Sequence, residues 1–269
     1  MKVLVIGAGN MGLAYADAIA QSDLLRTGDM LIYDKDSEKL KELKKIKHFS
    51  VQEDLALCTP EADIIFLAVK PFHAEDLYDE LRPHIQEDQI IISIMAGVSI
   101  GAMQGGMGLK KVVRAMPNLP AQVGKGLTTF TAAPEVSRLE LSTVESILDT
   151  TGRSIKLDNE NDIDASTGIS GSGPAYVFYF MQSMLEAALK MGFSEYDSKV
   201  LVSATFDGAI ELFKKHKLSP ESWMQKVASK GGTTQAALDS MEDNNVKERI
   251  QEAAFAAFNR AVELGKENA

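Results

Sequence analysis

The sequence predicts an α/β domain with a mainly parallel sheet, followed by an all-helical domain. From residue 2 to about residue 157, short runs rich in β-branched residues alternate with polar stretches of helical pattern. This alternation is typical of βαβ units, whose strands lie parallel in one sheet. After Leu157 the strand signals end, and long stretches rich in Ala, Leu, Met and Glu favour helices. A chain of 269 residues also exceeds the usual length of one domain, so two domains are expected.

Eight strands are expected in the first domain, with helices in the gaps between them. Each run has the length and the residue content of a strand and is bounded by turn-forming residues. The expected strands cover residues 2–7, 30–34, 46–50, 63–69, 89–94, 111–115, 126–131 and 154–157. The composition changes near residues 158–165, so we expect one domain over residues 1–160 and a second over residues 161–269.

Helix ends can be predicted at several points. Ser137 precedes a helical run with Glu140 three residues later, a pair that can satisfy two free backbone amides at a helix start. With Gly152 as the stop, this pattern predicts a helix over residues 138–150. Ser219 followed by Pro220 predicts a second start. Near the end of the chain, apolar residues at steps of three and four predict a helix with one buried face, formed by Val246, Ile250, Ala253, Ala257, Ala261 and Leu264.

Charge and composition exclude several classes of partner. The formal net charge is -10, which repels the phosphates of nucleic acids and membranes, so neither is an expected partner. No apolar run approaches the roughly 20 residues that span a bilayer. The start of the chain leaves no room for a signal peptide, so a cytoplasmic protein is expected. The single cysteine, Cys58, and four scattered histidines show no metal-ligand spacing, so no metal site is expected.

A glycine-rich motif directly follows the first expected strand. The letters GAGNMG stand at residues 7–12, and a helical run begins immediately after them. Gly7 permits a tight turn, Gly9 lets the backbone approach a pyrophosphate, and Gly12 allows close packing of helix on strand. Strand, glycine turn and helix in this order predict a dinucleotide site with the phosphates at the helix N-terminus. A tight turn without a ligand is the alternative.

Charged residues after the second strand bear on which nucleotide is bound. Asp34 stands where an acid can accept a hydrogen bond from the adenosine ribose 2′-hydroxyl and repel a 2′-phosphate, which favours NAD. Lys35 and Lys39 could instead pair with a 2′-phosphate, which would favour NADP. The choice between the two cofactors therefore stays open at this point.

Further candidate residues stand at the carboxyl ends of later strands, where ligands bind in open α/β sheets. The fourth strand ends in AVKP at residues 68–71, so Lys70 is expected to point towards the cofactor. The fifth ends in the small residues Ala96 and Gly97, which would let a nicotinamide or its ribose lie against the backbone. Two prolines stiffen the loop after the sixth strand, which presents the Asn118 amide.

Two segments rich in small residues stand in the helical half. One is GISGSGPAY at residues 168–176 and the other is SKGGTT at residues 229–234, and each is expected to form a loop that leads into a helix. Free helix N-terminal amides together with Ser or Thr hydroxyls suit a carboxylate. Ordinary helix capping is the alternative for either segment alone.

Taken together, these motifs resemble the signature series of the pyrroline-5-carboxylate reductases. The series is GAGNMG at residue 7, AVKP at 68, RAMPNLP at 114, GISGSGPAY at 168 and SKGGTT at 229, in the family's order over nearly the whole chain. The resemblance implies a Rossmann-like, doubly wound N-terminal domain that binds NADPH or NADH, and a C-terminal all-helical domain for substrate binding and dimerisation. It also implies a homodimer with interlocked helices, often in a ring of dimers. The implied reaction reduces 1-pyrroline-5-carboxylate to L-proline, the last step of proline biosynthesis.

The resemblance also assigns site residues. For the cofactor these are Gly7, Gly9, Asn10, Met11, Gly12, Ala68, Val69, Lys70, Pro71, Ala96 and Gly97, besides Asp34 and Lys35. For the substrate they are Ser229, Gly231, Gly232, Thr233 and Thr234, with the Thr234 hydroxyl near the imine nitrogen as the catalytic group. Two cations depart from the family's pattern: Lys230 replaces the proline of SPGGTT, and Lys226 stands three residues before Ser229.

The implied reaction makes modest demands on the protein. An iminium carbon is already electrophilic, so orientation matters more than a strong acid, which agrees with the lack of a His or Cys cluster near the motifs. Two other functions remain as alternatives. A hydroxy-acid or sugar-acid dehydrogenase would need a general base, for which Lys190 or Lys199 could serve. A catalytically silent dinucleotide sensor would account for Lys230 inside the substrate loop.

Overall fold

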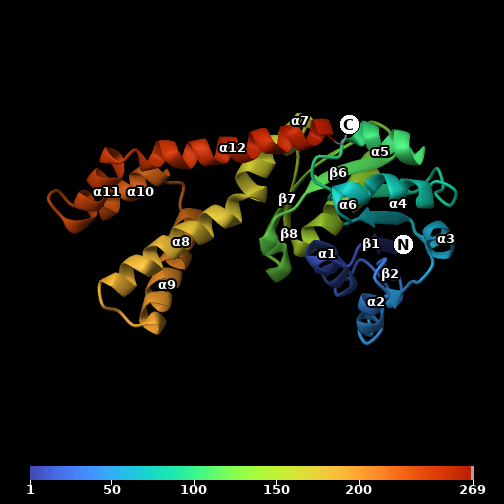
Figure 1. Ribbon diagram of the computed structural model, residues 1–269, viewed down its shortest axis with the longest axis horizontal. Coiled ribbons are helices and arrows are strands. Elements are labelled where there is room, and N and C mark those ends of the chain that lie inside the picture. Colours follow the sequence, from blue (N-terminus) through green and yellow to red (C-terminus); the bar gives the residue numbers. More distant parts are fainter. Residues whose placement is uncertain (268–269) are drawn as a thin grey trace. The chain divides into compact units, whose positions relative to one another are not determined.

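The computed structural model describes residues 1–267, and the chain forms two compact units (Figure 1). The first unit contains residues 1–172 together with the chain from Ala256 onward, and the second contains Gly173–Phe255. The first compact unit therefore extends beyond residue 160, where the sequence placed the end of the first domain. The end of the last helix also belongs to this first unit, and the sequence did not indicate this.

One eight-stranded sheet forms the centre of the first unit. Its strand order is β3-β2-β1-β4-β5-β6-β7-β8, and every neighbouring pair is parallel except β6 with β7. The strands are β1 Val3–Ile6, β2 Met30–Tyr33, β3 Ser50–Val51, β4 Ile64–Leu67, β5 Ile90–Ser93, β6 Val112–Met116, β7 Gly126–Ala132 and β8 Gly152–Lys156. The mainly parallel sheet and its eight strands are thus confirmed, with the third strand displaced.

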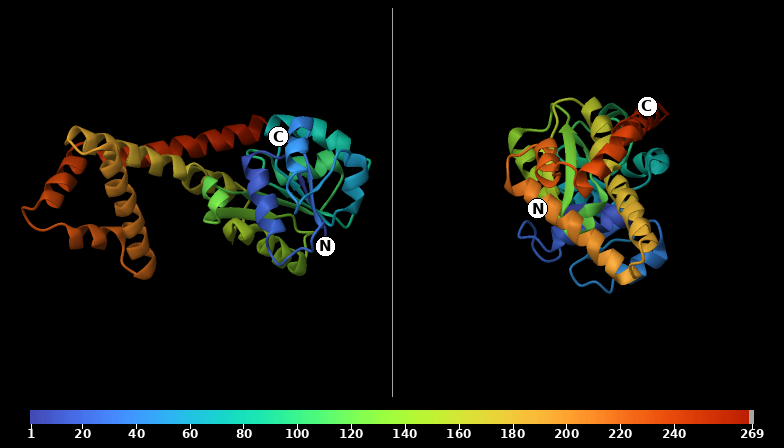
Figure 2. Two further views of the ribbon diagram at one scale, coloured as in Figure 1. Left: turned by 90° about the horizontal axis from the view of Figure 1, so that it is seen from below. Right: turned by 90° about the vertical axis from the view of Figure 1, so that its left-hand side faces the viewer.

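The central strands β1, β4, β5 and β6 are buried throughout, as the doubly wound architecture requires, whereas the edge strands β3 and β8 are partly exposed. Alternate residues of β1 point to opposite faces, so that Val3 and Val5 pack in one apolar core and Leu4 and Ile6 in the other. The helices of the first core are α1 Asn10–Ala20, α2 Ser37–Leu43 and α6 Arg138–Leu148. Those of the second core are α3 Leu55–Cys58, α4 Ala74–Leu81 and α5 Ile100–Met107. Helices therefore cover both faces of the sheet (Figure 2).

The third strand was predicted over residues 46–50, and this position is wrong. The amide of Ile46 donates to the carbonyl of Leu43 at 2.9 Å, and the amide of Phe49 donates to the carbonyl of Ile46 at 3.3 Å. These bonds continue the end of α2 as turns. Only Ser50 and Val51 are left to pair with β2, because the backbone before them is already bonded locally.

Three predicted helix ends are confirmed. At the start of α6, the Ser137 hydroxyl accepts the Glu140 amide at 3.3 Å, and the Glu140 carboxylate accepts the Ser137 amide at 2.8 Å. After α6 and the short 3-10 helix Asp149–Thr151, Gly152 with φ 149° turns the chain into β8. Helix α10 (Pro220–Val227) begins with Ser219 as its cap, at 3.1 Å from the Ser222 amide.

The second unit consists of helices, as predicted for this half of the chain. They are α8 Gly173–Lys190, α9 Glu195–Lys215, α10, α11 Thr233–Asp243 and the first half of α12 Val246–Glu267. Within residues 173–255 only Ser198 and Val202, both in α9, are buried. The apolar stripe of α12 is buried only towards its end, where Ala261 is buried, whereas Ile250 is 49% exposed. Among residues 1–267, no helix combines the length and the apolar content that crossing a membrane requires.

The segment at residues 168–176 was predicted to be a loop, and this is wrong. Helix α7 (Asn161–Ser166) continues into a π-helical turn over Thr167–Gly171, which leads almost directly into α8. The Ser172 amide donates to the Thr167 carbonyl at 2.8 Å, so it is not free for a ligand. Gly and Ser side chains are small enough to permit this wide turn, and such turns are frequent at functional sites.

Candidate functional site

The glycine turn after β1 has the geometry that the sequence predicted. Gly7 has φ 104°, and a Cβ atom there would lie 2.7 Å from the Ala68 carbonyl oxygen of the neighbouring strand end. A Cβ atom on Gly12 would lie 1.9 Å from the Gly7 carbonyl oxygen, so α1 can pack here only without a side chain. A Cβ atom on Gly9 would meet nothing within 4 Å. The first and third glycines therefore close the turn, and the second leaves its outer side open.

The N-terminus of α1 is free to meet an anion. Gly9 is the residue before the helix, no side chain caps the helix start, and no acidic residue stands in the first turn. The amides of Asn10, Met11 and Gly12 belong to that turn, where the helix dipole favours negative charge. Open space above Gly9 and an uncapped helix N-terminus together form a phosphate-binding arrangement.

A cavity of about 290 Å³ opens beside this turn. It lies at the carboxyl ends of β1, β2 and β4, where the strand order reverses from β1-β2-β3 to β4-β5-β6, the usual ligand position in such sheets. The structure brings seven of the predicted cofactor residues to its wall, namely Gly7, Gly9, Asp34, Lys35, Ala68, Val69 and Lys70. Pro71 follows Lys70 and begins the 3-10 helix Pro71–His73. The sequence did not identify three further wall residues, His73, Asp76 and Glu80.

Asp34 is the most constrained charged group of this cavity. Its Oδ2 atom accepts the Ala8 amide at 2.6 Å, and its Oδ1 atom accepts the Asp36 amide at 2.9 Å. Lys39 Nζ lies 3.5 Å from Oδ2. The Asp34 side chain is only 12% exposed, and its hydrogen bond to the Ala8 amide joins the end of β2 to the glycine turn. Lys35, in contrast, makes no hydrogen bond or ion pair within residues 1–267.

Ala96 and Gly97 lie in a different cavity of the first unit. This cavity measures about 280 Å³, and its wall also contains Asp164, Arg260 and Leu264. Gly97 has φ 72°, and a Cβ atom there would lie 3.0 Å from the backbone of Leu264 in α12. The end of α12 thus packs closely on the turn after β5. The sequence could not indicate this contact, because it joins the fifth strand to the last helix.

A buried ion-pair network near these residues was missed by sequence reasoning. Arg114 in β6 is 4% exposed, and its guanidinium lies 3.2 Å from Glu160 and 2.6 Å from Asp164. The same Glu160 carboxylate accepts the Ile100 amide at the start of α5, at 2.8 Å. The available signal was an arginine inside an apolar strand run. The Asn118 side chain, which the stiffened loop was expected to present, accepts the Leu127 amide of β7 at 2.9 Å.

In the second unit, the segment from Ser229 to Thr234 forms a turn that leads into α11. The Gly232 amide donates to the Ser229 carbonyl at 2.9 Å, and Gly231 has φ 73°. These are features of a type II turn, which places Lys230 at its second position and glycine at its third. Proline is favoured at that second position, so the lysine keeps the turn that a proline would form.

The N-terminus of α11 has the predicted free amides. Gly232 precedes the helix, no side chain caps it, and its first turn has no acidic residue. Thr233 is exposed and Thr234 is half-buried. The turn brings the Ser229 hydroxyl close to Gly232, where a Cβ atom would lie 2.5 Å from it. Amides and hydroxyls converge here in a manner that suits a carboxylate.

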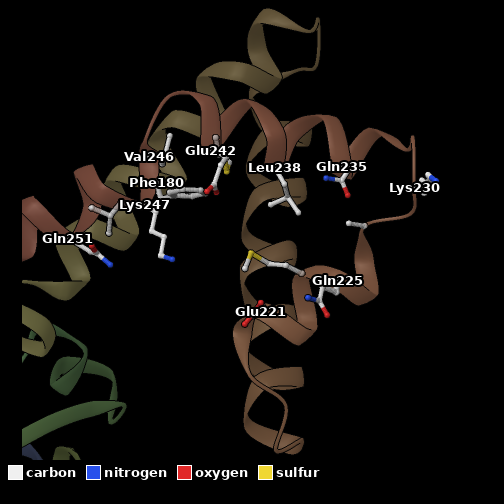
Figure 3. A pocket seen from close by; sticks show the side chains of 14 residues that line it. Phe180, Glu221, Gln225, Lys230, Gln235, Leu238, Glu242, Val246, Lys247 and Gln251 are labelled. Atoms are coloured by element: carbon white, nitrogen blue, oxygen red, sulfur yellow. The ribbon is translucent and has the colours of Figure 1, made fainter.

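A large cavity of about 1110 Å³ lies between α8, α10, α11 and α12 of the second unit (Figure 3). Apolar residues such as Phe180, Leu238 and Val246 line it together with polar ones. Lys230 and Lys247 stand at opposite ends of the cavity in Figure 3. The second unexpected cation, Lys226, lies 5.7 Å from the centre of the Trp223 ring. A cavity of this size, with an apolar part between exposed helices, is typical of a surface that another protein segment fills.

The candidate site therefore has two parts, one in each unit. The first unit holds the glycine turn and the cavity beside Asp34. The second holds the turn at residues 229–234 with the free end of α11. The first part suits a dinucleotide and the second suits a small carboxylate.

Comparison with known proteins identifies relatives over the whole length. Residues 160–264 match the family model for pyrroline-5-carboxylate reductase dimerisation, and residues 2–97 match that for coenzyme F420-dependent NADP oxidoreductase. Pyrroline-5-carboxylate reductase 2 of Bacillus subtilis is 33% identical, over 98% of this chain and 95% of its own. The Aquifex aeolicus pyrroline-5-carboxylate reductase is 32% identical, over 98% and 97%. The crystal structure of Plasmodium falciparum pyrroline carboxylate reductase with NADP bound has a TM-score of 0.89 and 30% identity, covering 98% of each chain.

Proposed function

The chain belongs to the pyrroline-5-carboxylate reductase family, and from this premise we propose how its residues carry out the reaction. The protein uses a nicotinamide dinucleotide to reduce 1-pyrroline-5-carboxylate to L-proline, the last step of proline biosynthesis. Full-length identity of 33% to a named reductase supports this reaction. The feature of the chain itself that carries the assignment is the turn before α11, because it distinguishes this family's chemistry from that of other dinucleotide-binding sheets.

The residues around the glycine turn fit a dinucleotide. Open space above Gly9 and the uncapped start of α1 would receive the pyrophosphate, with Asn10, Met11 and Gly12 in the first helical turn. Asp34 and Lys35 would face the adenosine ribose. Ala68, Val69, Lys70 and Pro71 would hold the part of the cofactor that crosses β4, and we assign Ala96 and Gly97 to its nicotinamide end. When bound, the reduced nicotinamide supplies the hydride for the imine carbon.

The turn before α11 would bind the substrate's carboxylate. The backbone amides of Gly231 and Thr233, together with the Ser229 hydroxyl, would offer several donors to one anion, whereas the Gly232 amide already donates to the Ser229 carbonyl and would hold the turn in shape. The Thr234 hydroxyl, one helical position further on, would meet the ring nitrogen and fix the orientation of the ring. Two anchors on a small rigid ring determine which of its atoms faces the cofactor.

Orientation is the main task of these residues. The ring nitrogen carries a proton in the iminium form, so the carbon beside it accepts hydride without an added acid. As the carbon becomes saturated, the nitrogen becomes an amine, and its hydrogen bond with Thr234 can persist through the step. Among the residues proposed for substrate binding there is no carboxylate, imidazole or thiol, which is consistent with this account.

The helical domain associates with a second copy of the chain. Its exposed apolar side chains support this, since Phe178 is 59% exposed, Tyr179 78% and Tyr196 76%. We further propose that the helices of two copies interlock, with the domain over residues 161–269 forming the interface, and that dimers assemble into rings. In such a dimer, the substrate turn of one copy would complete the site at the cofactor domain of the other. A cytoplasmic location stays a prediction.

A direct assay tests the proposed function. Racemic 1-pyrroline-5-carboxylate is mixed with the protein and with NADH or NADPH, and both the oxidation of the cofactor and the proline formed are measured. Proline formed in proportion to the cofactor oxidised is the expected result. Oxidation of a hydroxy acid with NAD or NADP, without reduction of the imine, would favour the dehydrogenase alternative. The turn at Lys230 keeps the form that a proline would give it, which removes the main support for a silent sensor.

A further inference from the structure

The position of Asp34 in the cofactor cavity determines which charge that cavity can accept. Asp34 follows β2, lines the cavity beside the glycine turn, and is 12% exposed. In sheets of this kind, an acid at this point faces the adenosine ribose, where NAD carries a hydroxyl and NADP a phosphate. The structure of the Plasmodium relative contains NADP. The choice between NADH and NADPH in this chain has to be argued from its own residues.

The carboxylate of Asp34 cannot readily turn away from this position. Oδ2 accepts the Ala8 amide at 2.6 Å, inside the glycine motif itself, and Oδ1 accepts the Asp36 amide at 2.9 Å. Moving the side chain aside would leave two backbone donors without a partner, at a cost comparable to that of lost hydrogen bonds to a charged group. A 2′-phosphate would therefore have to be accommodated next to a fixed negative charge.

The remaining charges of the cavity do not compensate for that negative charge. Three carboxylates, those of Asp34, Asp76 and Glu80, and three amines, those of Lys35, Lys39 and Lys70, line this cavity, so its wall has no surplus of lysines over acids. Lys39 already lies 3.5 Å from Asp34. The Glu80 carboxylate also acts on Tyr33 at the end of β2. Burial raises the pKa of the Tyr33 hydroxyl, and the negative charge of Glu80 raises it further. A phosphate monoester brings a charge of about -1.5 to -2 into these surroundings at neutral pH.

We propose that Asp34 makes this chain a reductase that prefers NADH to NADPH. The Asp34 carboxylate accepts a hydrogen bond from the ribose 2′-hydroxyl of NADH and repels the 2′-phosphate of NADPH. Lys35, exposed and without an acidic partner among residues 1–267, is not sufficient to reverse this preference. This inference rests on the proposed function in one respect, namely that the cavity binds a nicotinamide dinucleotide.

Nucleotide binding without any imine tests the inference. The Kd values of NADH and NADPH are measured by fluorescence titration of the full-length protein. For the wild type we expect NADH to bind at least about tenfold more tightly, which is the effect of a hydrogen bond to a charged group. Asp34→Asn keeps an acceptor for the Ala8 amide but removes the charge, and it should lower the ratio of the two Kd values by about ten- to a hundredfold.

Two matched variants separate Asp34 from its neighbours. Asp36→Asn makes the same change of net charge at a residue that caps α2 and does not line this cavity, so the ratio of the Kd values should not change. Lys35→Ala should also leave the ratio within about threefold of the wild-type value. If Lys35→Ala weakened NADPH binding tenfold and left NADH binding unchanged, the cation would set the choice and the inference would be wrong.

The remaining outcomes are equally decisive. Equal or tighter binding of NADPH by the wild type overturns the inference, as does an unchanged ratio in Asp34→Asn. Binding of neither nucleotide contradicts both the inference and the proposed function. Tighter binding of NADH combined with no reduction of the imine would contradict the proposed function and leave the inference standing.

Discussion

Replacing Lys230 by proline tests whether the substrate turn has the geometry described above. The turn runs from Ser229 to Gly232, closed by the bond from the Gly232 amide to the Ser229 carbonyl at 2.9 Å. Gly231 at the third position has φ 73°, and among residues 1–267 only Asn245 is a non-glycine residue with positive φ. Lys230 therefore has negative φ, as the second position of a type II turn requires, and proline fits that position.

The expected gain in stability can be estimated from the unfolded chain. Proline at a compatible position stabilises a protein by about 0.4–1 kcal/mol, because it restricts the unfolded state more than the folded one. No hydrogen bond from the Lys230 amide is present within residues 1–267, so the ring removes no bond. For a chain of this size, the gain corresponds to a rise in Tm of about 1–4 °C.

The matched control is Lys230→Ala, which removes the same charge without adding the ring. Thermal unfolding of the two variants, under one set of conditions, isolates the effect of the ring from that of the charge. The KM for 1-pyrroline-5-carboxylate, measured for both, then shows whether the lost cation matters for substrate binding. We expect Lys230→Pro to unfold at a higher temperature than Lys230→Ala and the two to have equal KM values.

A lower Tm for Lys230→Pro than for Lys230→Ala would refute the reasoning. It would mean that residue 230 does not adopt the φ value of proline, or that its amide has a partner. The assignment of the turn as type II would then fail. The conclusion that lysine can replace the family's proline without changing the turn would fail with it.

Three further predictions concern catalysis, the glycine turn and acid stability. Thr234→Ala should lower kcat/KM about tenfold or more, through loss of one oriented hydrogen bond, and Thr234→Ser should restore most of it; unchanged kinetics in Thr234→Ala would remove this residue from the mechanism. The Cβ atom of Gly9→Ala would point into open space, so the free energy of unfolding should stay within about 0.5 kcal/mol of wild type. The same Cβ atom would occupy the space proposed for the pyrophosphate, so nucleotide binding should weaken more than tenfold. Equal nucleotide affinity of variant and wild type, measured by titration, would contradict the phosphate site. The hydrogen bond from the Lys111 ammonium at 2.6 Å is the largest of the effects that lower the pKa of the Glu140 carboxyl from 4.5 to about 2, and bonds from Ser137 add to it. The stabilising effect of these bonds is therefore complete above pH 4.5 and is lost as the pH falls towards 2. Urea unfolding should therefore show Lys111→Met less stable than wild type at neutral pH, with a difference that shrinks across this range; a difference independent of pH would contradict the pairing.

The sheet could be predicted from the sequence because its strands are short, its central strands are fully buried, and regular helical stretches separate them. The third strand was displaced because residues 46–49 contain an apolar pair, Ile46 and Phe49, that reads as a strand. The Ile46 amide is already bonded to the Leu43 carbonyl at the end of α2, and the Phe49 amide to the Ile46 carbonyl. The segment at residues 168–176 was misassigned for the opposite reason. Gly and Ser usually indicate loops, whereas here their small side chains permit a π-helical turn within a nearly continuous helix.

The predictable part of the site is the part set by backbone geometry. The close packing expected at Gly7 and Gly12 follows from their spacing and is confirmed, and the space beside Gly9 is open, as its predicted role in pyrophosphate binding would require. Contacts between distant segments were not predictable. Arg114 pairs with two acids that follow it by 46 and 50 residues, and no local pattern indicates such a pairing. In the same way, the sequence indicates only an ordinary polar helix face for Asp76 and Glu80, although both line the cavity beside the glycine turn.

The helical unit connects catalysis to self-association. Within residues 173–255 only Ser198 and Val202 are buried, which is too small a core to offset the loss of conformational entropy on folding. The exposed apolar side chains of α8 and α9 must therefore be covered for this unit to be stable, and a second copy presents the same apolar surfaces. The turn at residues 229–234 lies in this unit and depends on its folding. If this turn binds the substrate's carboxylate, as proposed, the site would form only when the helices are covered by a second copy, and a separated subunit would keep the glycine turn but lose substrate binding.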